Sequence, residues 1–162
     1  MRKWYWIIGV VAIAALDLWT ADVASETLPL GTPRRLLGHL VRLQLIENRG
    51  AMLGLGSTHP VAITALGIFG TVVLALASWR WPRYGSPLAL MAGGALGNVM
   101  SRLLFGYVVD FIRVVGYPGI FNLADVALRV GVVWLIARLW IRGRQEGTPY
   151  PEGREKDNGV SP

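Results

Sequence analysis

The sequence predicts an all-α membrane protein with four transmembrane helices and a small extracytoplasmic loop domain that contains β-structure. Of its 162 residues, 53% are hydrophobic and only 16% are charged, which is more apolar than an ordinary soluble domain. The apolar residues gather into four segments, each close to the roughly 20 residues that a helix needs to cross a bilayer. These segments carry almost no polar face at the helical period. They cover about residues 5–24, 61–78, 87–104 and 121–141.

The charge and the missing cysteines exclude several classes of function. The net charge is +6, but the basic residues stand singly between apolar runs, so we expect contact with membrane lipids and not with nucleic acid. The chain has no cysteine, which excludes disulfides, thiolate nucleophiles and cysteine-bound metals. His39 and His59 have no acidic or histidine residue at ligand spacing, and we expect both on the surface without a metal.

The first apolar segment has an alternative interpretation as a cleaved secretory signal. Arg2 and Lys3 precede it, as in a signal peptide. Asp17 within the run and Asp22 near the expected cleavage site argue against cleavage, and three further spans follow. We therefore expect the first span to stay in the mature protein.

The segments between the spans differ in character. In the outer loop 25–59, Val41–Ile46 alternates like a strand and Asn48–Gly50 resembles a turn, so we expect a small sheet on the outer surface of the membrane. Ser57 and Thr58 before Pro60 predict the start of the second helix. Residues 80–86 form a short inner turn. We expect one four-helix transmembrane domain over 1–142 and a disordered cytoplasmic tail over 143–162.

The basic residues favour an orientation with both termini in the cytoplasm. The N-terminus, the second loop and the tail hold nine Lys and Arg residues, whereas the first and third loops hold six. Cytoplasmic loops carry an excess of Lys and Arg. The bias is modest, but an even number of spans places both termini on one side.

The polar residues within or beside the spans all fall at the outer end of the bundle. Ionisable groups at such depth are costly and by default functional. The small residues Ala89, Gly93, Gly97 and Ser101 recur every four positions, which predicts a helix-packing stripe and not a nucleotide loop. Asn98 with Arg102, and Asn122 with Asp125, share helix faces. The convergent set is Asp17, Asn48, Asn98, Arg102, Asp110, Asn122 and Asp125.

Two carboxylates in this set can perform acid–base chemistry. Carboxylates that meet in a low-dielectric site share a proton, so that one acts as base and the other as acid. Asp110, on the loop that leaves span three, and Asp125, one turn into span four, have a topology that allows this. Such a pair can activate water against an amide carbonyl. Alternatively, Asp125 and Arg129 form an idle structural pair, Asp110 is a solvated loop residue, and Asp17 only accepts supporting hydrogen bonds.

Four ordered motifs resemble those of the bacterial lipoprotein signal peptidases, the signal peptidase II family. The resemblance covers roughly residues 5–141, and the order and spacing of the motifs match. The motifs are Asn48-Arg-Gly50-Ala51-Met-Leu-Gly54, Gly93-Gly94-Ala95-Leu-Gly97-Asn98-Val-Met-Ser-Arg102, Gly106-Tyr-Val108-Val109-Asp110-Phe111 and Phe121-Asn122-Leu-Ala124-Asp125.

The resemblance implies an aspartic intramembrane peptidase of the bacterial inner membrane with its active site at the outer face. It implies cleavage of diacylglyceryl-modified prolipoproteins on the amino side of the lipidated cysteine, without metal or cofactor, and we expect a monomer. Asp110 and Asp125 match the catalytic aspartates. The supporting positions match Asp17, Asn48, Gly50, Asn98, Arg102 and Asn122.

The chain departs from the family pattern at four positions. Ala21 stands where the family usually has Lys, Ser101 where it often has Asp, and Leu53 where Phe is usual, while Arg129 adds a charge to span four. These departures leave open a noncatalytic relative that binds lipidated peptides. A proton or ion conduit is a further alternative, but it needs polar groups through the whole membrane thickness.

Overall fold

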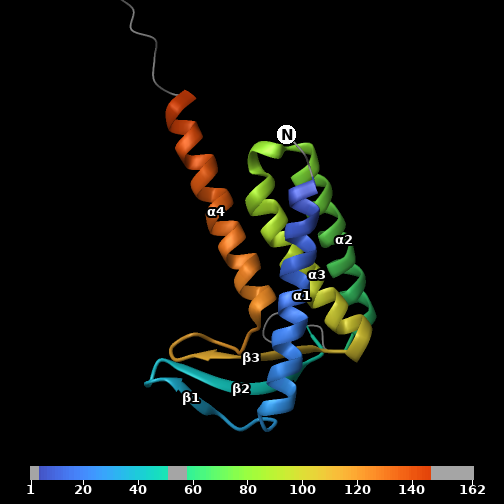
Figure 1. Cartoon of the computed structure of the whole chain (residues 1–162), viewed down its shortest axis with the longest axis vertical. Coiled ribbons are helices and arrows are strands. Elements are labelled where there is room, and N and C mark those ends of the chain that lie inside the picture. The colour runs from blue at the N-terminus through green and yellow to red at the C-terminus, as the bar shows by residue number, and fades with distance from the viewer. Residues whose placement is uncertain (1–3, 51–57, 147–162) are drawn as a thin grey trace, which may run out of the picture.

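The structure is a bundle of four helices with a three-stranded sheet lying across one end (Figure 1). The computed structural model describes residues 4–50 and 58–146. Arg2, Lys3, the motif residues 51–54 with Leu53, Ser57 and the tail from residue 147 onward lie outside this part. In chain order the elements are α1 (Trp4–Thr27), β1 (Arg34–Leu37), β2 (Val41–Asn48), α2 (Pro60–Arg80), the 3₁₀ helix η2 (Pro82–Tyr84), α3 (Gly85–Phe105), β3 (Val108–Val114) and α4 (Leu123–Glu146).

Three helical segments in the described residues are long and apolar enough to cross a membrane. They are Trp4–Thr27, Pro60–Arg80 and Pro82–Phe105, and they contain the first three predicted spans. Only 11% of the most apolar stretch of α2 is buried inside the protein, so its apolar side chains face outward, as they do in a helix surrounded by lipid. The fourth helix, α4, also forms where predicted and continues to Glu146. It is less apolar because Asp125, Arg129 and Arg138 lie in it.

Small residues let α3 occupy the centre of the bundle, where it contacts α1, α2 and α4. A Cβ added to Gly93 would lie 2.8 Å from the Cβ of Ile13, and one added to Gly97 would lie 2.7 Å from Oδ2 of Asp17. On another side of α3, a Cβ at Gly94 would collide with the carbonyl oxygen of Ala124 in α4. The predicted small-residue stripe is therefore confirmed as a packing surface.

The sheet is built from two segments that lie far apart in the sequence, the one between α1 and α2 and the one between α3 and α4. Its order is β1-β2-β3, with both pairs antiparallel. β2 contains the predicted strand and runs on to Asn48, where we expected a turn. β3 was expected to be a loop: Val108–Ile112 lacks clean alternation, and its pairing with β2, about 60 residues away, supplies the hydrogen bonds that local sequence does not show. Asp110 consequently lies on a strand.

The sheet is fixed to the bundle through a small apolar core and a short connection. Ala21 and Ala24 of α1 pack against Leu45 of β2 and Val109 of β3. Gly106 ends α3 in the left-handed conformation (φ 79°), and its amide donates to the carbonyl of Arg102, which is a common helix stop. β3 therefore leaves α3 at once and crosses the end of the bundle. Trp4 and the end of α4 lie at the opposite end (Figure 1).

Replacing Gly94 by Ala should force α3 and α4 apart, because the added methyl group meets the backbone of Ala124. We expect a loss of about 1–3 kcal/mol in the free energy of unfolding, measured as a lower midpoint of thermal unfolding in detergent. Gly70→Ala in α2 is the matched control, since a Cβ there meets nothing within 4 Å. Equal midpoints for both variants would contradict the tight contact at Gly94.

Candidate active site

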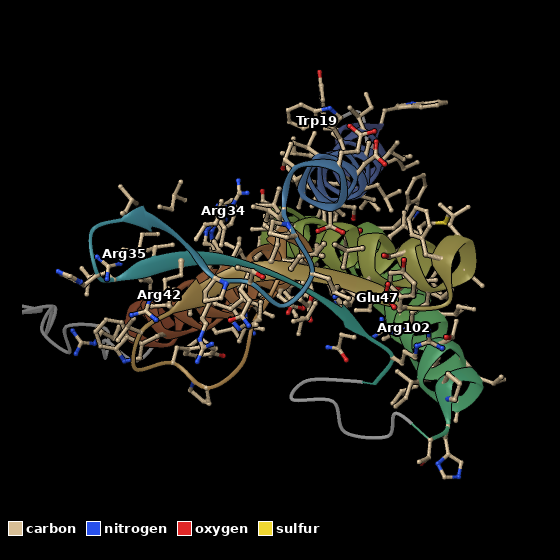
Figure 2. All side chains as sticks on the ribbon, turned by 90° about the horizontal axis from the view of Figure 1, so that it is seen from below. Trp19, Arg34, Arg35, Arg42, Glu47 and Arg102 are labelled. Carbon is tan, nitrogen blue, oxygen red and sulfur yellow. The ribbon has the colours of Figure 1, made fainter. Side chains whose placement is uncertain are left out.

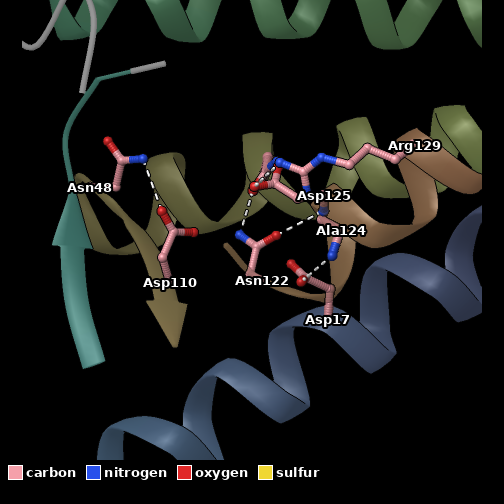
Figure 3. Close-up of polar contacts among 8 residues, drawn as sticks. Asp17, Asn48, Asp110, Asn122, Ala124, Asp125 and Arg129 are labelled. Atoms are coloured by element: carbon pink, nitrogen blue, oxygen red, sulfur yellow. Dashed lines mark hydrogen bonds and ion pairs between the residues drawn. The ribbon is translucent and has the colours of Figure 1, made fainter. Parts of the chain in front are cut away.

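Asp110 lies in the middle of β3 and is only 2% exposed. Its Oδ2 accepts a hydrogen bond of 2.9 Å from Nδ2 of Asn48 on β2 (Figure 3). Its Oδ1 is buried without a hydrogen-bond partner among residues 4–50 and 58–146. Burial raises the pKa of Asp110 to about 7; the hydrogen bond from Asn48 opposes this rise and the charge of Asp125 adds to it. Asp110 is therefore a carboxyl that holds a proton near neutral pH.

Asp125 lies in the first turn of α4. Its Oδ1 accepts a hydrogen bond of 3.0 Å from Nδ2 of Asn98 on α3, and its Oδ2 is 3.8 Å from a guanidinium nitrogen of Arg129. The guanidinium of Arg129 also lies over the rings of Tyr117 and Phe121, at 5.4 and 4.9 Å from their centroids. The Asp125 carboxylate therefore lies between an amide donor of α3 and a cation that is held against two aromatic rings.

Two asparagines connect α3 with the start of α4. Oδ1 of Asn122 accepts a hydrogen bond of 2.8 Å from the amide of Asp125, and its Nδ2 donates to Oδ1 of Asn98, also at 2.8 Å. Asn122 is thus the N-cap of α4, with an exposed fraction of only 1%. The cap and the Asn98 bond together fix both the backbone and the carboxylate of Asp125.

Asp17 holds the same helix start from the other side. Its Oδ1 accepts a hydrogen bond of 2.7 Å from the amide of Ala124. The carboxylate is 2% exposed and lies against Gly97. A negative group at a helix N-terminus is favourable because the first amides are unpaired and carry partial positive charge. The Asp17 carboxylate thus bonds a backbone amide of α4, which fits the supporting role that the sequence left open for it.

Arg102 and Gly50 connect α3 to the segment that follows β2. Arg102 donates to the carbonyl of Gly50 at 2.7 Å and to the carbonyl of Asn98 at 3.1 Å. The amide of Gly50 donates to Oδ1 of Asn48 at 3.0 Å. Asn48 thereby has its amide group oriented from one side by Gly50 and from the other by Asp110.

A cavity of about 400 Å³ brings the two carboxylates together. Asp110 and Asp125 both line it, together with Arg129 and the segment from Tyr117 to Ile120. The apolar lining residues include Ile63, Leu66, Val99 and Leu128. Of the predicted site residues, the lining includes Asn48, Asn98, Arg102, Asp110 and Asp125, whereas Asp17, Gly50 and Asn122 support it from behind.

Sequence reasoning did not place the segment 117–120 or Arg129 in the wall of the cavity. In the sequence, Gly116, Pro118 and Gly119 are a turn signal that could have indicated an ordered loop. In the structure both glycines have positive φ angles. His39 and His59 are exposed, as expected. Across the described ranges, no three His, Asp or Glu side chains are grouped as metal ligands would be.

Comparison with known proteins identifies the family. Residues 9–141 match the sequence model of signal peptidase (SPase) II. This chain belongs to the signal peptidase II family. As a member of this family it is an aspartic-type protease, and the apolar helices agree with a membrane enzyme.

Named relatives and solved structures agree with this membership over most of the chain. A lipoprotein signal peptidase of Burkholderia pseudomallei is 46% identical over 141 residues, which cover 80% of this chain and 84% of that protein. One from Syntrophomonas wolfei is 35% identical over 153 residues, covering 90% and 97%. A solved bacterial membrane enzyme superposes with a TM-score of 0.74 at 25% identity, covering 92% of this chain and 94% of that one. Another gives 0.68 at 27% identity, covering 83% and 92%.

Removing the Asp17 carboxylate should destabilise the start of α4. Asp17→Ala leaves the buried amide of Ala124 unpaired, and we expect a loss of about 1–3 kcal/mol in the free energy of unfolding. Asp17→Asn keeps an acceptor oxygen and should lose less. Asp22→Ala, at an exposed position of the same helix, is the control. If Asp17→Ala unfolds at the same temperature as this control, Asp17 does not anchor α4.

Proposed function

We propose that this signal peptidase II removes signal peptides from prolipoproteins that carry a diacylglyceryl group on cysteine, cutting on the amino side of that cysteine. The observation that carries the proposal is that Asp110 and Asp125 line one cavity, whose lining also includes apolar side chains such as Ile63, Leu66 and Val99. The names of the relatives supply the substrate class. The apolar lining residues suit acyl chains and a signal helix, while the polar ones suit the peptide bond.

In the proposed mechanism the two carboxylates divide the acid and base roles. Asp125, which lies beside Arg129, is the base in this proposal and takes a proton from water. The resulting hydroxide attacks the carbonyl carbon before the lipidated cysteine. Asp110, whose pKa is raised to about 7 by burial, supplies the proton that stabilises the oxyanion and then reaches the leaving amine. The C–N bond breaks, giving the signal peptide carboxylate and the free amino group of the cysteine.

The amide and guanidinium groups around the dyad have positioning roles in this proposal. Asn48 orients Asp110, and Asn98 orients Asp125. Arg102 lines the cavity and holds the carbonyls of Gly50 and Asn98, and its remaining N–H groups are proposed to bind carbonyl oxygens of the peptide or of the lipid ester. The water and the scissile amide then meet between two fixed carboxyl groups, which is the condition for efficient general acid–base catalysis.

We further propose that α4 is the fourth transmembrane span of a monomeric inner-membrane enzyme. Its N-terminal half packs on α3 through Gly94 and Gly131, so it shares the depth of the other spans. The two described chain ends lie at one end of the bundle and the sheet at the other. The basic residues favour the cytoplasm for the termini, which puts the cavity and the sheet at the outer face.

Asp110→Asn and Asp125→Asn should each abolish processing, because each removes one of the two proton-transfer groups. Cleavage of a lipidated precursor is read from its shift on a gel, and detergent extraction from membranes checks that the variants still insert. Asp22→Asn, at an exposed position outside the lining of either cavity, is the control and should process normally. Full cleavage by either dyad variant would overturn the assignment and leave a lipopeptide-binding or other role for the site.

The pH dependence of cleavage should report the proton on Asp110. Because burial raises the pKa of Asp110 to about 7, the side chain loses its proton as the pH rises through this value, and kcat/KM, which reports the groups of the free enzyme, should fall in the same range. The measurement is kcat/KM against pH in detergent, with each sample returned to about pH 6 to show that activity recovers. A rate that is constant or still rising between about pH 7 and 9 would show that Asp110 is not the acid.

A further inference from the structure

A second cavity continues from the first one along the sheet. It has a volume of about 730 Å³. On one side it is lined by the last residues of β2 and the two residues after them, from Ile46 to Gly50, and on the other by the segment from Tyr117 to Ile120. Asn48 and the whole of Tyr117–Ile120 line both cavities. The lining of the second cavity holds no residue of a helix, so it leads away from the bundle and over the sheet.

The sheet beside this cavity carries three arginines in one cross-strand row. The register pairs Arg35 of β1 with Arg42 of β2, and Arg42 with Arg113 of β3. Residues directly opposite each other in an antiparallel pair point to the same face, and like charges so placed are destabilising. Figure 2 shows Arg35 and Arg42 together at one end of the sheet and Glu47 toward the other.

The charges nearby do not neutralise the row. Glu47 is the one acidic residue between positions 28 and 50, and it lies 3.7 Å from Arg49. Arg113 lines the second cavity and donates to Gln44, a neutral side chain, at 2.7 Å. Nε of Arg42 is buried without a hydrogen-bond partner in the described part of the chain. The row therefore presents an uncompensated positive surface that begins at the wall of the second cavity.

We propose that the second cavity receives the polypeptide that follows the lipidated cysteine, and that Arg113 in its lining binds acidic side chains, with the neighbouring Arg42 adding positive charge beside it. This inference rests on the proposed function. A peptide cut in the first cavity continues in two directions from the scissile bond, and its apolar signal sequence belongs with the apolar side chains. The second cavity shares part of its lining with the first cavity and is bordered by strand residues. It is therefore the path for the polar polypeptide that follows the cysteine. Its charge selects acidic residues.

The test compares lipidated precursors that differ only in the few residues after the cysteine, carrying Asp, Asn or Lys there. We expect kcat/KM for the Asp precursor to exceed that for the Lys precursor by about fivefold, an effect of exposed ion pairs, and to lose this advantage in high salt. Arg113→Gln and Arg42→Gln should bring the ratio close to one. Arg113→Glu should reverse the order of the precursors. Arg34→Gln is the matched control, because Arg34 pairs with Leu43 and faces the other side of the sheet.

Two results would overturn the inference. One is an equal kcat/KM for the Asp and Lys precursors with the wild-type enzyme. The other is a loss of activity in Arg113→Gln that is the same for all three precursors and occurs only in vesicles containing anionic phospholipid, which would assign the row to lipid headgroups.

Binding of the uncleaved precursors to the full-length Asp110→Asn variant separates this inference from the proposed function. Tighter binding of the Asp precursor, lost on adding Arg113→Gln, supports the acidic selectivity even if the dyad assignment fails. Equal affinities for the Asp and Lys precursors would refute the selectivity even if cleavage proceeds as proposed.

Discussion

The start of α4 is held by buried hydrogen bonds from two other helices, and the geometry of the site depends on this anchor. Asp17 of α1 accepts from the amide of Ala124, and Asn122 caps the amide of Asp125. Asn98 of α3 bonds both Asn122 and the Asp125 carboxylate. In a bilayer an unpaired amide at this depth is costly, so the anchor stabilises the fold and positions the Asp125 carboxylate at the same time. The glycines of α3 make it possible, because side chains at Gly94 or Gly97 would push these partners away.

The sheet supplies the second carboxylate from a different direction. β3 follows α3 directly and pairs with β2, which places Asp110 beside Asn48 and over the end of the bundle. The two aspartates therefore belong to separate rigid elements that meet at one cavity. Their environments differ: Asp110 is buried with one unpaired oxygen, whereas Asp125 faces a guanidinium. In the proposed mechanism, that difference allows a pair of identical residues to take opposite roles in proton transfer.

Much of the bundle could be predicted from the sequence because it depends on local composition. Apolar length located the helices, the four-residue period of small side chains located the α3 packing surface, and Pro60 marked the start of α2. The convergence of Asp17, Asn98, Arg102 and Asp125 followed from their common level along the spans. The motif resemblance added the family, which the comparisons confirm.

The features that the sequence did not predict depend on contacts between distant segments. β3 becomes a strand only through β2, and the row Arg35–Arg42–Arg113 exists only in the register of the folded sheet. The charges of α4 make it less apolar than the other spans, yet Asp125 and Arg129 pair with each other and Arg129 lies against aromatic rings. The segment Tyr117–Ile120 lines both cavities, and no pattern of polar and apolar residues in the sequence indicates this.

The most direct test of the account is an experimental structure of the enzyme bound to a lipidated peptide in which a secondary alcohol replaces the scissile amide. Such an alcohol occupies the place of the attacked carbonyl. We expect its hydroxyl within about 3 Å of a carboxyl oxygen of both Asp110 and Asp125, with the chain beyond the cysteine lying over the sheet. A hydroxyl that contacts neither aspartate, or an alcohol bound outside the shared cavity, would contradict the account.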